Sequence, residues 1–155
     1  MDKKEYKQKR KEYFKMIRKH KRILSKINKE LAMWDWTGGL DYLVAWITYL
    51  RDYYKLGFNI DLDDQERERI VSSLDQTLDA YHEWQDFSVQ YFHLEEKDVF
   101  TFEREENNGV RTSLVKFKYP ELYSDESLET YERQLGEKRD AFFSLLSKNL
   151  ETWWN

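Results

Sequence analysis

The sequence predicts a mainly α-helical protein, a bundle of about four helices with a small β-hairpin insertion. Long segments without proline repeat their apolar residues every three or four positions, which is the period of an amphipathic helix. Near residues 98–119 the pattern changes to alternation around an Asn-Asn-Gly turn, which indicates a hairpin. The 155 residues include 5 Gly, 1 Pro and 0 Cys, which excludes collagen-like, low-complexity and disulfide-stapled proteins.

Charge divides the chain unevenly. Residues 1–30 contain 13 Lys and Arg against 4 Asp and Glu, whereas the remaining residues contain 13 against 26. We therefore predict a basic amphipathic helix over residues 1–31 and an acidic helical bundle domain over residues 32–155. Such asymmetry indicates either an anionic partner or docking of the basic helix on the acidic remainder.

The first helix is expected over 3–31, where good helix formers dominate. Its apolar residues form a narrow seam, listed here as Tyr6, Tyr13, Ile17, His20, Leu24, Ile27 and Leu31. The opposite face is cationic and supplies the candidate partner-binding residues Lys4, Lys11, Lys15, Arg18, Arg22 and Lys26. Three interpretations of this face stay open: a phosphate-bearing partner, a membrane surface, and docking within the chain or plain solvation.

The next two helices are predicted from their ends. Gly38-Gly39 indicates a turn, and Asp35 or Thr37 is expected to cap the largely apolar helix that follows over 40–56. Gly57 then suits the position after the helix, since it tolerates a positive φ. A third helix is expected to begin at Asp61 or Asp63, with Asp63 and Glu66 resembling a capping box, and to reach Phe92.

The predicted hairpin turns at Asn107-Asn108-Gly109. Phe100 and Phe102 would share one face of the first strand, as would Val115, Phe117 and Tyr119 on the second. An isolated hairpin is marginally stable, so it should lean on the helices. Disorder, or a helix continuing through Glu96, is the alternative.

The last helix is expected to begin at Ser124 or Asp125, to contain Gly136, and to reach the C-terminal tryptophans. Neighbouring residues on a helix differ by about 100°, so Trp153 and Trp154 cannot both face one core. One of the two should be partly exposed or pack on another element, and both are candidate partner-binding residues.

The sequence indicates no catalytic residue, no metal site and no cofactor, and we predict that the protein is not an enzyme. It contains no Gly-x-Ser-x-Gly, P-loop or Gly-x-Gly-x-x-Gly, and His20, His82 and His93 lack metal-ligand spacing. An acidic helix face is expected to be solvated or to face the basic helix, with cation binding as the alternative; its residues are Asp75, Asp79, His82, Glu83 and Asp86. No apolar run is long enough for a membrane span and the N-terminus lacks a signal peptide, so we expect a cytoplasmic protein.

Four segments together resemble a group of small phage-encoded helical proteins: Trp34–Trp36, Leu40–Leu43, Leu50–Asn59, and Asp140–Trp154 with its terminal tryptophan pair. In that group the pair is usually followed by Asp, where this chain has Asn155. The resemblance implies a viral origin, a helical fold and the cytoplasm of an infected bacterial cell. It carries over no catalytic or binding residue.

Three functions are consistent with these observations. The first is a non-enzymatic phage protein that binds a host protein or ribonucleoprotein through the basic helix and an aromatic surface. The second is a nucleic-acid binder that uses residues 1–30. The third is a small-ligand or nucleotide-sequestering protein with an aromatic pocket between the second and last helices. Self-association as a homo-oligomer through the narrow seam is also open.

Overall fold

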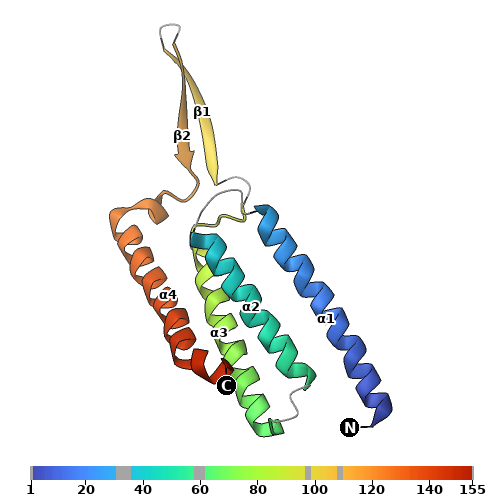
Figure 1. Cartoon of the computed structure of the whole chain (residues 1–155). Coiled ribbons are helices and arrows are strands. Elements are labelled where there is room, and N and C mark those ends of the chain that lie inside the picture. The colour runs from blue at the N-terminus through green and yellow to red at the C-terminus, as the bar shows by residue number, and fades with distance from the viewer. Residues whose placement is uncertain (1, 31–35, 58–61, 97–98, 108–109, 155) are drawn as a thin grey trace. The chain divides into compact units, whose positions relative to one another are not determined.

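The computed structural model describes residues 2–30, 36–57, 62–96, 99–107 and 110–154. Within these residues it contains four α-helices, an antiparallel two-stranded hairpin and one short 3₁₀-helix (Figure 1). The predicted fold class, a mainly α bundle with a small hairpin, is confirmed. The elements are α1 (Lys3–Glu30), α2 (Trp36–Leu56), α3 (Asp64–Tyr91), β1 (Phe100–Asn107), β2 (Val110–Phe117), η1 (Pro120–Tyr123) and α4 (Asp125–Trp154).

The chain forms two compact units. The first comprises Met1–Asp79 and Ser144–Asn155, and the second comprises Ala80–Phe143. Two of the helices, α3 and α4, therefore contribute residues to both units. The division predicted at residue 31 follows charge and stays a prediction.

The core of the first unit joins α2, α3 and the end of α4. Its buried residues are Ile47, Tyr54, Ile70, Leu74, Leu78 and Trp153. The Tyr54 hydroxyl donates a hydrogen bond to the Trp153 carbonyl oxygen at 3.1 Å. The Trp153 indole N–H donates to the Ser73 hydroxyl at 2.8 Å. Both polar groups of these large aromatic side chains are hydrogen-bonded, which offsets the desolvation cost of burying them.

The first helix, α1, lies beside α2 and runs in the opposite direction (Figure 1). The predicted seam is partly buried: His20 and Ile27 are buried, while Tyr6 and Leu24 are exposed. Met16, outside the predicted seam, is also buried. The buried face of α1 is thus rotated by about 40° from the predicted seam toward Met16, because it packs on the aromatic side of α2. There the His20 ring meets Tyr49 edge to face at 5.3 Å.

The prediction for the start of α2 is wrong, whereas the prediction for its end is confirmed. Gly38 and Gly39 lie within the first turn of α2, so the predicted turn there is wrong. The first turn tolerates glycine because its N–H groups have no intrahelical partner to lose. Thr37 lies inside the helix, and Asp35 lies outside the described residues. Gly57 is confirmed at the other end, with φ of 62°.

The start of α3 is as predicted. The Asp63 carboxylate accepts a hydrogen bond from the Glu66 backbone N–H at 2.7 Å, which is the first half of a capping box. The helix ends at Tyr91, one residue before the predicted Phe92.

In the second unit, residues 80–91 of α3 pack on residues 125–143 of α4. Phe142 is fully buried and its ring stacks on that of Trp84 at 6.0 Å. The Phe87 and Tyr131 rings stack at 5.7 Å, and the Tyr91 hydroxyl donates to the Ser127 carbonyl at 2.8 Å. Aromatic side chains therefore make much of the contact between α3 and α4 in this unit.

The predicted hairpin is present in the second unit, with Phe100 opposite Phe117 and Phe102 opposite Val115. Tyr119, expected on the second strand, lies beyond the end of β2, and Asn108 and Gly109 of the predicted turn lie outside the described residues.

Contacts near the base of the hairpin tie it to the turn segment that follows α3: Glu96 accepts hydrogen bonds from Lys118 at 2.6 Å and from the Tyr119 hydroxyl at 2.7 Å. Beyond the base, however, the hairpin extends away from the helices of its unit (Figure 1). The expectation that it leans on them is wrong for most of its length, because Phe102 is 70% exposed.

Candidate functional site

A groove of about 560 Å³ lies between α1 and the C-terminal end of α2. We call it the α1–α2 groove, and its lining residues are Glu12, Lys15, Met16, Arg18, Lys19, Arg22, Asp52, Lys55 and Leu56. Five of these carry a positive charge and two carry a negative charge. Met16 and Leu56 give the groove an apolar surface, and its charged residues leave an excess of positive charge.

The helical repeat places the cations together. Lys15, Arg18, Lys19 and Arg22 follow one another at spacings of three, one and three residues, so they share one face of α1. With a rise of about 1.5 Å per residue, this row spans about 10 Å of the helix. Lys55 joins the row from α2 because α1 and α2 are packed side by side.

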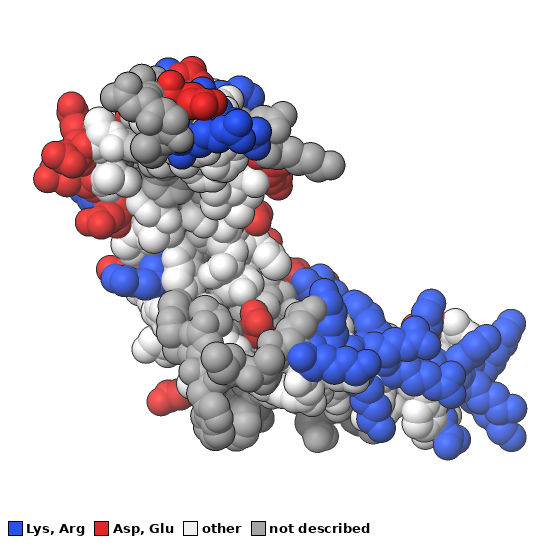
Figure 2. Space-filling model, turned by 90° about the horizontal axis from the view of Figure 1, so that it is seen from above, with Lys and Arg blue, Asp and Glu red and all other residues white. Residues whose placement is uncertain are grey.

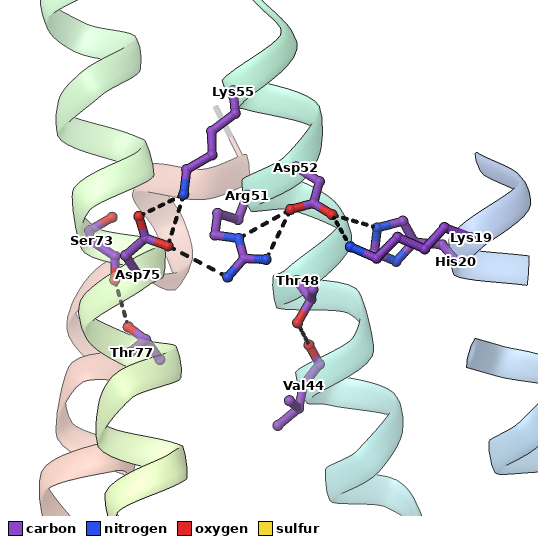
Figure 3. Close-up of polar contacts among 10 residues, drawn as sticks. All are labelled: Lys19, His20, Val44, Thr48, Arg51, Asp52, Lys55, Ser73, Asp75 and Thr77. Atoms are coloured by element: carbon purple, nitrogen blue, oxygen red, sulfur yellow. Dashed lines mark hydrogen bonds and ion pairs between the residues drawn. The ribbon is translucent and has the colours of Figure 1, made fainter. Parts of the chain in front are cut away.

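Asp52, which lines the groove, makes polar contacts between α2 and α1 (Figure 3). One of its oxygens lies 3.0 Å from the Lys19 ammonium and 3.1 Å from His20 Nε2. The other accepts hydrogen bonds from the Arg51 guanidinium at 3.0 and 3.2 Å. A single carboxylate from α2 therefore holds two side chains of α1.

The network continues to α3 through Asp75. Lys55 donates to its carboxylate at 3.0 Å, and the Arg51 guanidinium lies 3.6 Å from it (Figure 3). Asp75, on the acidic face of α3, thus pairs with side chains of α2 and, among the described residues, not with the basic helix α1. Three helices of the first unit are joined by alternating positive and negative side chains.

The pKa of the Asp52 carboxyl reflects two opposed effects. Burial raises this pKa, while hydrogen bonds from Lys19, Arg51 and His20 lower it, and the net direction is downward from its ordinary value. Asp52 is therefore ionised at neutral pH and offsets part of the positive charge in the groove.

Three groove cations have no such partner. Lys19 and Lys55 pair with Asp52 and Asp75. Among the described residues, Lys15, Arg18 and Arg22 make no ion pair, and all three are exposed. Figure 2 shows lysine and arginine side chains gathered into a continuous patch at the lower right, over α1. The unpaired positive charge of the groove is thus supplied by three residues singled out from the sequence.

The remaining predicted site residues are distributed differently. Lys4, Lys11 and Lys26 are exposed on α1 but do not line the groove. Trp153 is 2% exposed and belongs to the core, so burial removes it from any partner-binding surface. The side chain of Trp154 lies outside the described residues.

Sequence reasoning missed Lys19, Lys55 and Asp52 as site residues. Lys19 could have been found, since it lies four residues after Lys15 and three before Arg22. Lys55 and Asp52 depend on how α2 packs against α1, which no local pattern contains. Where the described residues of α2 and α4 meet, Tyr54 and Trp153 pack together in the core, and the pocket expected between the second and last helices stays a prediction.

Comparison of the chain with known protein families, with curated proteins and with solved structures found no match. Within the described ranges, no group of three or more His, Asp or Glu side chains is arranged to hold a metal ion. No helix in the described part of the chain combines the length and apolar character that crossing a bilayer requires.

Proposed function

We propose that the protein is a non-enzymatic binding protein that holds the phosphate backbone of a nucleic acid, free or within a ribonucleoprotein, in the α1–α2 groove. One observation carries this proposal: Lys15, Arg18 and Arg22 project unpaired positive charge into a groove whose other two cations are already neutralised. Phosphate groups are the natural partners of closely spaced lysine and arginine side chains.

The spacing of these cations supports a backbone contact rather than base reading. Charges repeated along about 10 Å of one helix face suit consecutive phosphates along a strand. No base-reading motif accompanies the groove in the sequence, so binding independent of sequence is expected. The resemblance to small phage-encoded proteins supports a host nucleic acid or ribonucleoprotein, in the cytoplasm of an infected bacterial cell, as the partner.

The test compares two triple variants that remove equal charge from α1. The first replaces Lys15, Arg18 and Arg22, which line the groove, by Gln. The second replaces Lys4, Lys7 and Lys11, which are exposed on the same helix outside it, by Gln. Affinity for a fluorescent oligonucleotide is measured by anisotropy over a range of salt concentrations, for single-stranded and duplex probes.

For the wild type we expect a log–log salt slope of about −2 to −3, corresponding to phosphate contacts by the three unpaired groove cations. The groove variant should lose about two to three units of this slope, since each phosphate contact contributes about 0.7–0.9. The control variant should change the slope by less than one unit. A salt-independent wild type, or equal losses in both variants, contradicts the proposal.

A nucleotide-sized anion is the second candidate, favoured by the groove volume of about 560 Å³ and by its apolar residues Met16 and Leu56. Such a ligand would stabilise the wild type by an amount that grows with the logarithm of its concentration over Kd, and so raise its melting temperature, but not that of the groove variant. A nucleoside triphosphate that stabilises the wild type, combined with no oligonucleotide affinity, would favour this candidate.

A further inference from the structure

The part of the α1–α2 groove nearest to α2 carries no unpaired positive charge. Met16 is 7% exposed and turns toward α2, and consecutive residues of a helix are about 100° apart around its axis. Glu12 therefore lies only about 40° round α1 from Met16, and Lys19 lies about 60° round on the same side. Lys19 is paired with Asp52, and Leu56 adds apolar surface from α2. We call this part of the lining, with Glu12, Met16 and Leu56, the inner groove.

The unpaired positive charge lies farther out. Relative to Met16, the three cations without an ion pair among the described residues are about 100°, about 120° and about 160° round α1, on the same side as Glu12. In that order they are Lys15, Arg22 and Arg18. This row forms the outer rim of the groove. A ligand that fits both parts is therefore anionic where it meets the rim, and uncharged and partly apolar where it meets the inner groove.

Glu12 determines what kind of group the inner groove accepts. One of its carboxylate oxygens accepts a hydrogen bond from the Gln8 amide at 2.6 Å, and no cation among the described residues forms an ion pair with it. Asp52 differs, because Lys19 and Arg51 already bond its two oxygens. An ionised carboxylate repels a phosphate and accepts hydrogen bonds from N–H and O–H groups. The inner groove thus favours a neutral group that carries a hydrogen-bond donor.

We propose that the α1–α2 groove binds a single strand of nucleic acid, with its phosphates on the outer rim and a base turned into the inner groove; this inference rests on the proposed function. Bases are the neutral, partly apolar part of such a strand, and they carry N–H donors on the edge that pairs in a duplex. A single strand leaves these edges and the base faces free. A duplex pairs and stacks its bases inside and offers phosphates to the rim alone.

The dimensions of the groove agree with a strand that is partly enclosed. Its volume of about 560 Å³ lies within the range of about 300–1,000 Å³ of sites that enclose small molecules, which is too small for a duplex. The row of rim cations extends over about 10 Å of α1, so it suits consecutive phosphates better than one phosphate group. Phosphate contacts to the rim supply the salt-dependent part of binding, and the base in the inner groove supplies the preference for a single strand.

The test uses three fluorescent probes of equal length: a single strand, the corresponding duplex, and a strand in which abasic sites replace the bases. The abasic strand keeps every phosphate, so it matches the single strand in charge. Anisotropy at one salt concentration should show that the single strand binds at least about ten-fold more tightly than the abasic strand or the duplex. The salt slopes of the single strand and the abasic strand should agree, because both place the same phosphates on the rim.

Two variants that each remove one carboxylate from α1 separate the inner groove from the general charge of the helix. Glu12→Ala removes the inner carboxylate, whereas Glu5→Ala removes an exposed carboxylate outside the groove. Both changes should strengthen the binding of all three probes to a similar extent, because both raise the net charge of α1 by one. Only Glu12→Ala should also reduce the preference for the single strand over the abasic strand, by about three-fold or more, because the base loses its acceptor.

A second pair of variants tests the apolar contact. Leu56→Gln makes the inner groove more polar, whereas Leu24→Gln changes a leucine that is 38% exposed on α1 outside the groove. Leu56→Gln should reduce the preference for the single strand over the abasic strand and leave the salt slope unchanged. Leu24→Gln should behave as the wild type. Far-UV circular dichroism checks that all four variants keep the helical content of the wild type.

The outcomes distinguish this inference from the proposed function. Equal affinities for the single strand and the abasic strand, with a salt slope that the groove variant still reduces, overturn the inward base and leave the phosphate contact standing. A wild type without salt-dependent affinity for any probe contradicts both. Equal effects of Glu12→Ala and Glu5→Ala on the preference overturn the role of the inner groove. A nucleoside triphosphate that displaces the single strand at equal concentration overturns the strand as the ligand, in favour of a free nucleotide.

Discussion

At the scale of single residues, Asp52 determines how α1 is held on α2. Its side chain is 19% exposed, and it contacts Lys19 and His20 of α1 and Arg51 of its own helix. An unpaired carboxylate buried to this degree would be destabilising, whereas one that accepts several hydrogen bonds stabilises the fold. The low pKa of Asp52 expresses the same balance, since its partners favour the ionised form.

We expect Asp52→Asn to lower the free energy of unfolding by about 1–2 kcal/mol near neutral pH. The folded-state pKa of Asp52 lies below its unfolded value, so its contribution is complete above the unfolded pKa of about 3.9. The contribution is lost as the pH falls through the folded-state pKa. Urea unfolding of both proteins from about pH 7 to about pH 3 should show their difference shrinking below about pH 4. A difference that is the same at every pH would assign the loss to packing instead.

At the scale of elements, the effect of adding a Cβ at a glycine distinguishes helical backbone from a left-handed turn. A Cβ added at Gly39, within the first turns of α2, or at Gly136, inside α4, meets nothing within 4 Å. Gly57 differs, since its φ of 62° is rare for residues with a side chain. The three positions therefore separate helix propensity from conformational strain.

Gly136→Ala and Gly39→Ala should each raise the free energy of unfolding by about 0.5–1 kcal/mol, since alanine loses less backbone entropy on folding. Gly57→Ala should lower it by about 1–2 kcal/mol, the penalty of the left-handed conformation. Chemical denaturation followed by circular dichroism measures all three. If Gly39→Ala destabilises as Gly57→Ala does, then a turn and not a helix begins α2.

The elements were predictable where the signal is local. Apolar periodicity, the Asp63 cap and the Asn-Asn-Gly turn each act over a few residues, so they predicted α1, α3 and the hairpin closely. The start of α2 was missed because paired glycines usually mark turns, and only packing shows that the helix includes them. Likewise Lys15, Arg18 and Arg22 could be predicted from one helix, whereas Lys55 and Asp52 became site residues through contact between two helices.

At the scale of the whole molecule, the basic helix has two roles that charge alone does not distinguish. Residues 1–30 carry the positive excess of the sequence, which suggests a detachable arm. In the first unit, however, α1 buries Met16, His20 and Ile27 and is bonded to Asp52 of α2. One helix thus both supplies the groove cations and covers α2, so removing it changes stability as well as charge.

Deletion of residues 1–31 should therefore lower the melting temperature by about 10–20 °C. Burial of Met16 and Ile27 contributes about 1.5–3 kcal/mol each, and about 2–4 °C accompanies each kcal/mol in a chain of this size. The variant with Lys4, Lys7 and Lys11 replaced by Gln is the control, since it keeps the buried face of α1 and should melt close to the wild type. Thermal unfolding followed by circular dichroism makes the comparison. If the truncated chain has the same melting temperature as the wild type, α1 is an independent basic arm. Its cations would then contact a partner without forming a groove with α2.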